Sequence, residues 1–383
     1  MNNFQNEISK LNATFAIRKY KELSMTETSN KSYIKYSWFL MGFVFLVILA
    51  GGVVRMTQSG MGCPDWPTCF GMWIPPTDAS QLPADFEQYL SQQDIDHSFN
   101  VYHTWIEYIN RLLGAILGVF IFGYAIWTSI KFSSRKSRMK SLLLFNLGTA
   151  TFLFIVAIFG SSLSLNIVGV VFILFALYSL FFAIRHAYSR SLVVVSILLL
   201  IAVAIQGWLG KIVVEENLSV VKITIHMIGA LVIAALPLIN ISNLKEEKIE
   251  VTPFIKHLMS GMIIVVLIQI VLGTQVREEI DVISKALSYE QRELWIENLG
   301  SIFIIHRSFS WVVLLGSLAL YFRGRDILVF AKTCRWIIIN VVTIIVVGVT
   351  MVYLDMPAVS QPLHLLLACA LLMQLLFGRI RFT

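Results

Sequence analysis

Long apolar runs limit most strongly what this chain can fold into. Ten stretches have a suitable length to cross a membrane: 36–55, 107–130, 141–162, 166–185, 190–213, 220–241, 255–276, 301–322, 334–353 and 361–379. A helix of about 20 apolar residues crosses a hydrocarbon core of about 30 Å and satisfies its own backbone hydrogen bonds there. Because 57% of the residues are hydrophobic and only 14% are charged, we predict an all-α polytopic membrane protein.

The distribution of positive charge predicts the orientation of these helices. Lysine and arginine are frequent in the leader 1–35 and in the short segments after the second, fourth, sixth, eighth and tenth runs. With ten spans these segments all fall on one side, and the positive-inside rule makes that side cytoplasmic. We therefore expect a multi-pass protein of a bacterial-type cytoplasmic (inner) membrane, with both termini cytoplasmic. The net charge of +7 then reflects orientation, and no nucleic-acid partner is expected.

The sequence contains a weak internal repeat. The matching pieces are "GGVVR" (51–55) with "GTQVR" (273–277), "INR" (109–111) with "IHR" (305–307), and "IHMIGAL" (225–231) with "LHLLLACAL" (363–371). Runs 1, 2, 5 and 6 then correspond to runs 7 to 10. We predict two pseudo-symmetric four-helix bundles in tandem plus an inserted helical hairpin, an architecture that can hold cofactors between facing helices.

This correspondence sets the expected domain boundaries. They are a cytoplasmic N-terminal segment 1–35, an N-terminal bundle 36–241 with the extra hairpin at about 138–186, a cytoplasmic linker 242–254 and a C-terminal bundle 255–383. The leader is too long and too polar for a cleavable signal peptide, so the first run is expected to remain as a spanning helix.

Three histidines lie inside predicted spanning helices near their outer ends: His226, His306 and His364. Ionisable residues at membrane depth are rare and usually functional. Two histidines on facing helices, without a nearby cysteine or acidic cluster, fit axial ligation of a haem better than a zinc site of three or four ligands. The alternative is a polar residue that bonds a neighbouring helix. His306 and His364 form a complete pair, and Arg307 is expected either to bind a haem propionate or to extend toward the membrane interface.

The first half differs at the position that matches His306, where Asn110 stands. An amide is a poor iron ligand, so a haem iron held by His226 would be five-coordinate or weakly six-coordinate. His103 lies on the same helical face as Asn110, but it is displaced by about 10 Å along the axis. We expect it to replace the missing ligand only if the macrocycle sits closer to the outer surface.

Glu107 has no carboxylate counterpart in the second half, where Phe303 matches it. A carboxylate near the hydrocarbon boundary costs several kcal/mol unless it is paired or protonated. Arg111, four residues on, is expected to be a structural partner for it or, like Arg307, to bind a haem propionate. The alternative is a catalytic carboxylate that orients substrate, stabilises charge or relays a proton.

The outer loop "MGCPDWPTCFGMWIPP" (61–76) is rigid by composition, since it contains four prolines. Its two tryptophans can lie at the membrane interface as a lid. Cys63 and Cys69 are expected either to staple this lid as a disulfide or to exchange between thiol and disulfide states.

Together these motifs resemble the heme A synthase family, the integral membrane enzymes that convert haem O to haem A for terminal oxidases. The matching elements are "GGVVRMTQSGMGCPDWPTC", "EYINR", "QGWLG" with "IHMIGAL", "QIVLG", "IHR" and "LHLLLA". The paired cysteines around "PDWP" are the most specific of them, and the resemblance covers most of 36–379.

The resemblance implies a role for each candidate residue. His306 and His364 would hold a haem b, and substrate haem O would bind near His226 and the Asn110 position. Glu107 matches the family's glutamate, in a reaction that oxidises a haem methyl to a formyl by successive hydroxylation and loss of water. Implied partners are membrane lipid, an electron donor and the farnesyltransferase that produces haem O. Two departures from the family pattern are Asn110, in place of the usual histidine, and the hairpin, which is extra to eight helices.

Two other classes of protein are compatible with parts of the pattern. A non-enzymatic haem b electron-transfer protein would need complete ligand pairs in both halves and has no use for Glu107. A transporter would suit the repeat and the polar residues within the membrane. The repeat is parallel and the histidines cluster at the outer ends, which disfavours a transporter.

Overall fold

In the computed structural model, the described residues are 30–91, 99–132, 189–216, 218–244 and 248–383, with a few positions between 174 and 181. Eight helices within them are long and apolar enough to span a membrane: Asn30–Met56, α3 (Val101–Phe132), α6 (Arg190–Glu215), α7 (Val220–Leu244), α8 (Pro253–Ala286), α10 (Ser301–Gly324), α11 (Leu328–Tyr353) and α12 (Ser360–Arg381). Short helices are η1 (Ala79–Gln81), α2 (Phe86–Ser91) and α9 (Arg292–Glu297). The predicted all-α polytopic fold is confirmed. The run 141–162 and all but a few positions of the run 166–185 lie outside the described residues, as does nearly all of the predicted hairpin.

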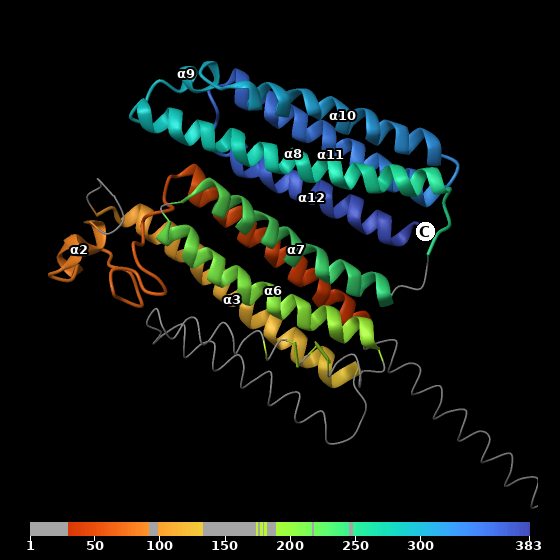
Figure 1. Cartoon of the computed structure of the whole chain (residues 1–383), viewed down its shortest axis with the longest axis horizontal. Helices are drawn as coiled ribbons and strands as arrows, with labels where there is room; N and C mark the ends of the chain where they lie inside the picture. The colour runs from red at the N-terminus through yellow and green to blue at the C-terminus, as the bar shows by residue number, and fades with distance from the viewer. Residues whose placement is uncertain are drawn as a thin grey trace, which may run out of the picture.

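The long helices lie side by side in two groups (Figure 1). In the first group α6 packs against α3 and α7, and the red helix Asn30–Met56 lies along α7. In the second, α8 packs against α10 and α12, and α11 against α10 and α12. Helices α12 and α8 both contact α7, so the groups meet there. The predicted domain boundaries stay a prediction. Below, the end of the helices that carries residues 57–100 is called the loop end.

A buried polar cluster ties the first group together at the end opposite the loop end. The Tyr33 hydroxyl lies 2.9 Å from Thr128 Oγ1, and the Tyr124 hydroxyl lies 2.8 Å from Ser37 Oγ. Asn240 of α7 donates to both tyrosine hydroxyls at 3.1 Å. Hydrogen bonds between spanning helices fix their axial register, because a slip would leave these groups unpaired in an apolar environment.

Helix α8 extends further than its apolar run, which ends at residue 276. The predicted loop 277–300 begins with about three further helical turns. Charge pairing explains this extension, because Arg277 and Asp281, four residues apart, form an ion pair at 2.9 Å. After the extension, the Glu279 carboxylate accepts a hydrogen bond at 3.2 Å from the Gly300 amide, just before α10 begins at Ser301.

Candidate functional site

A cavity of about 2170 Å³ runs between the helices of both groups. Its lining includes the three histidines and the asparagine singled out in the sequence: Asn110, His226, His306 and His364. A typical small-molecule pocket has a volume of about 300–1,000 Å³. The cavity is therefore large enough for more than one ligand of haem size.

In the second group, His306 of α10 and His364 of α12 face each other. Their ring centroids are 6.3 Å apart. Two imidazoles that bind one metal from opposite sides, each through a bond of about 2 Å, bring their ring centres to a separation of this order. Each ring also lies against a glycine, because a Cβ added at Gly273 or Gly348 would be 3.3 Å from the Cε1 atom of His306 or His364.

The first group repeats this arrangement with one substitution. A Cβ at Gly210 would be 3.4 Å from His226 Cε1, and one at Gly51 would be 4.0 Å from Asn110 Oδ1. In both halves, therefore, a side chain of the second helix lies near a glycine of the first, and a histidine of the fourth helix lies against a glycine of the third.

Buried polar atoms without partners lie along the cavity wall. The Nδ1 atoms of His226, His306 and His364 and the Oδ1 atom of Asn110 are buried and have no hydrogen bond among the described residues. The ring nitrogens that face the cavity are therefore the Nε2 atoms, the usual side of an imidazole for binding a metal. The paired rings fit a haem at the His306–His364 position, and the equivalent place of His226 on the cavity wall fits a second haem there.

Two glutamines hold the backbone of the histidine helices, and the sequence interpretation did not identify them. Gln206 donates to the His226 carbonyl at 2.8 Å, and Gln269 donates to the His306 carbonyl at 2.7 Å. Both glutamines precede a glycine of the site by four residues, as in "QGWLG" and "QIVLG". That shared spacing is the signal that could have found them.

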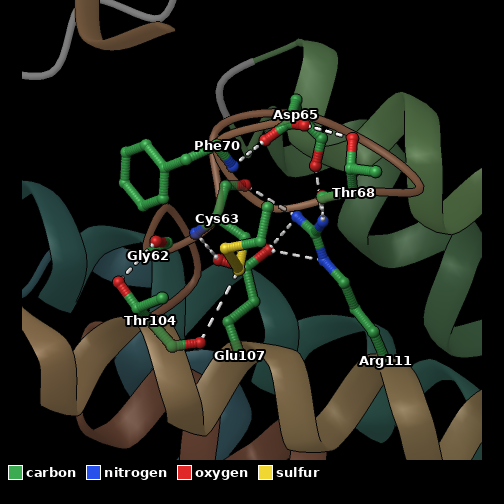
Figure 2. Close-up of polar contacts among 9 residues, drawn as sticks. Gly62, Cys63, Asp65, Thr68, Phe70, Thr104, Glu107 and Arg111 are labelled. Atoms are coloured by element: carbon green, nitrogen blue, oxygen red, sulfur yellow. Dashed lines mark hydrogen bonds and ion pairs between the residues drawn. A yellow bond between two sulfur atoms is a disulfide. The ribbon is translucent and has the colours of Figure 1, made fainter. Parts of the chain in front are cut away.

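Glu107 and Arg111 form a buried pair on α3 (Figure 2). Glu107 is 3% exposed, and its Oε2 accepts a hydrogen bond from the Cys63 amide at 2.8 Å. Its Oε1 pairs with Arg111, whose Nε lies at 3.1 Å. Both residues also line the cavity.

Arg111 uses its remaining donors on the loop above it (Figure 2). Its two Nη atoms donate to the carbonyl oxygens of Cys63, Asp65 and Thr68. A guanidinium has five N–H donors, and with Glu107 as the fourth partner residue all five are accounted for. This geometry favours the structural role of Arg111 over binding of a propionate.

Arg307, the counterpart of Arg111, has different surroundings. Its guanidinium carbon lies 5.7 Å from the centre of the Phe303 ring, and the residue lines the cavity. Among the described residues, it forms no ion pair with a carboxylate. Arg307 can therefore pair with an anionic group of a ligand.

The loop that Arg111 holds is closed by the Cys63–Cys69 disulfide, so the predicted disulfide is confirmed. Within the loop, the Asp65 carboxylate accepts hydrogen bonds from Thr68 Oγ1 and from the amides of Phe70 and Gly71. Trp66 lines the cavity. The disulfide, Asp65 and Arg111 therefore fix a rigid cover at the loop end of the cavity.

His103 lies beneath this loop and is not among the residues that line the cavity. Its Nδ1 is 3.3 Å from the Gln58 carbonyl oxygen. The structure therefore does not bring His103 together with His226, and Asn110 remains the residue opposite Gly51.

Charged residues join the two halves at the cavity wall. Arg55 of the first helix pairs with Asp281 and, at 3.7 Å, with Glu278 of α8. Arg277 donates to the Arg55 carbonyl at 3.0 Å. Nearby, Thr224 and Thr274 are hydrogen-bonded at 3.1 Å. In the sequence, Arg55 and Arg277 served only to mark the repeat. Only the packing of the halves shows that they meet.

Comparison with known proteins identifies the family. The model of the COX15-CtaA family, described as cytochrome oxidase assembly protein, matches residues 34–160 and 164–376. The chain belongs to this family.

Relatives in this family carry the name heme A synthase. The chain is 32% identical over 97 residues to the heme A synthase of Shewanella oneidensis, covering 24% of this chain and 27% of the relative. It is 29% identical over 107 residues to that of Exiguobacterium sibiricum, covering 28% and 29% of the two chains. It is 33% identical over 91 residues to the heme A synthase of Paracoccus denitrificans, covering 21% of this chain and 24% of the relative. The aligned stretches thus span between a fifth and a third of each chain.

Proposed function

We propose that this protein oxidises a methyl group of haem O to a formyl group, giving haem A for terminal oxidases. Support comes from the family and from the names of its relatives. The observation that carries the proposal is the difference between two equivalent sites on one cavity. One has two histidines with ring centroids 6.3 Å apart, and the other has His226 with Asn110 at the matching position.

His306 and His364 would hold haem b, with Arg307 available to its propionates. Bound there, haem b would supply one-electron transfer, which suits a complete histidine pair. His226 would hold haem O as substrate. Asn110 is a poor iron ligand, so this site would have an incomplete ligand pair, which suits oxidative chemistry; an electron-transfer protein would need a second complete pair.

The remaining residues of the first site would position substrate and exclude water. The rigid cover of residues 61–76 closes the loop end of the cavity, so that the reacting methyl is shielded from solvent. We assign Glu107 as the carboxylate on which the reaction depends. Both of its oxygens are engaged by Arg111 and Cys63, so it orients the cover directly over the site. It would relay a proton only if one of these contacts opened.

The test is haem extraction from membranes of a host that makes haem O but lacks its own heme A synthase. Expression of this chain should produce haem A, identified by the pyridine haemochrome spectrum. Expression of the His226→Ala variant should leave haem O unconverted. Membranes that contain the folded chain with its haem b but no haem A would favour the electron-transfer protein and would overturn the proposal.

A further inference from the structure

The cavity is deeper in the first half of the molecule than in the second. Along α3 it is lined from Asn110 down to Phe122, which is about 18 Å at 1.5 Å per residue. Along α10, the equivalent helix, it is lined from His306 only to Val313, or about 10 Å. The site beside His226 therefore continues about 8 Å further from the loop end on this wall.

The facing wall shows the same difference. Along α6 the lining runs from Gly210 to Ile197, about 20 Å, whereas along α11 it runs from Gly348 to Val341, about 10 Å. The other two helix pairs show no difference. Their lining extends over eight residues in each case, from Gly51 to Val44 and from Gly273 to Val266, then from His226 to Ile233 and from His364 to Leu371. The extra space thus lies between α3 and α6, and we call it the deep arm.

A glycine opens the wall of the deep arm on α3. The repeat pairs Gly118 with the larger Leu314 of the second half. A Cβ added at Gly118 would meet no atom within 4 Å. Leu314 does not line the cavity, so the second half is closed at the position where Gly118 leaves the first half open.

The surroundings of the deep arm define what it can bind. Its walls are apolar, and it reaches the surface at Val119, which lines the cavity and is 68% exposed. Val119 lies within a spanning helix and is not covered in the part of the chain that the structure describes, so this opening faces lipid. At the other end of the arm are Asn110 and His226, which also line the cavity. The occupant must therefore combine a polar or metal-bearing head beside His226 with a long apolar chain.

We infer that the deep arm binds the isoprenoid chain of haem O and that it makes the first site selective for a haem carrying such a chain. This inference rests on the proposed function, since it assigns haem O to His226. Haem b lacks the chain, which accounts for the shallower second site. The isoprenoid chain lies between α3 and α6, and its end extends into the bilayer past Val119.

The test compares two haems on the purified protein carrying its resident haem, in lipid nanodiscs. Ferric haem O and protohaem, which has no isoprenoid chain, are titrated and followed by absorbance. The Gly118→Leu variant introduces the side chain that the second half has at the equivalent position, about 12 Å along α3 from Asn110 and away from the porphyrin. The dissociation constant of the Gly118→Leu variant for haem O should rise at least about tenfold, because the isoprenoid chain and the new side chain compete for one space. The dissociation constant for protohaem should stay unchanged.

Gly123→Leu is the matched control. Gly123 is also on α3, and a Cβ there meets no atom within 4 Å, but the residue does not line the cavity. This variant should bind both haems like the wild type. Retention of the resident haem shows that each variant is folded.

Two results would overturn the inference while leaving the proposed function intact. One is unchanged haem O binding in Gly118→Leu, which would mean that lipid alone occupies the deep arm. The other is an equal loss of haem O and protohaem. A wild-type protein that takes up neither haem would instead overturn the proposed function, and the inference with it.

Discussion

Replacing Glu107 by alanine should release the cover of the cavity. The substitution removes the acceptor for the Cys63 amide and the ion-pair partner of Arg111. The two paired side chains are only 4% and 14% exposed, so little solvent screens the interaction. Breaking a buried ion pair on one side costs about 3–5 kcal/mol. Because Arg111 also holds three loop carbonyls, we expect this loss to appear as local opening of residues 61–76.

The assay for Glu107→Ala has two readouts. Hydrogen exchange should accelerate at the amides of residues 61–76 while the amides of α8 and α12 stay protected. Extracted haems should show accumulation of haem O or a hydroxylated intermediate at the expense of haem A. Glu107→Gln keeps one acceptor oxygen but removes the charge. It should destabilise the cover less than the alanine variant does, by about 1.5–3 kcal/mol, for the lost charged hydrogen bond with Arg111. Normal haem A output from the alanine variant would refute the reasoning.

Two further predictions concern the histidine sites. Gly273→Val adds a branched side chain where a Cβ is already 3.3 Å from His306 Cε1. Overpacking costs about 1–3 kcal/mol, so the affinity for haem b should fall by about five- to 150-fold. The haem b content after purification should fall, as measured by pyridine haemochrome analysis; full haem b content would contradict the contact. Asn110→His completes the first-half pair, so the haem at His226 should show a six-coordinate spectrum and haem A output should fall. An unchanged spectrum would show that Asn110 does not face the iron.

The helices and the disulfide were predictable because their signals are local. Apolar runs of about 20 residues define spanning helices whatever surrounds them, and the repeat located Asn110, His226, His306 and His364 on equivalent elements. The extension of α8 was not predictable from hydropathy, because ion pairs stabilise those polar turns.

The different uses of Arg111 and Arg307 depend on packing that a single sequence does not reveal. Both follow the ligand position of their helix, so their sequence contexts match. The backbone path of the disulfide loop brings three carbonyls to Arg111, whereas among the described residues the side chain of Arg307 meets the ring of Phe303. The deep arm likewise could not be located without the register between α3 and α6, although the pairing of Gly118 with the larger Leu314 is visible once the repeat is aligned.

The central claim is that the two histidine sites hold different haems. The most direct measurement is the identity and amount of haem per protein in the wild type, His226→Ala and His306→Ala, each purified from cells that make haem O. The account predicts that His306→Ala loses haem b and keeps the farnesylated haem, whereas His226→Ala keeps haem b and loses the farnesylated haem. Loss of the same haem from both variants, or haem b in both sites of the wild type, would contradict it.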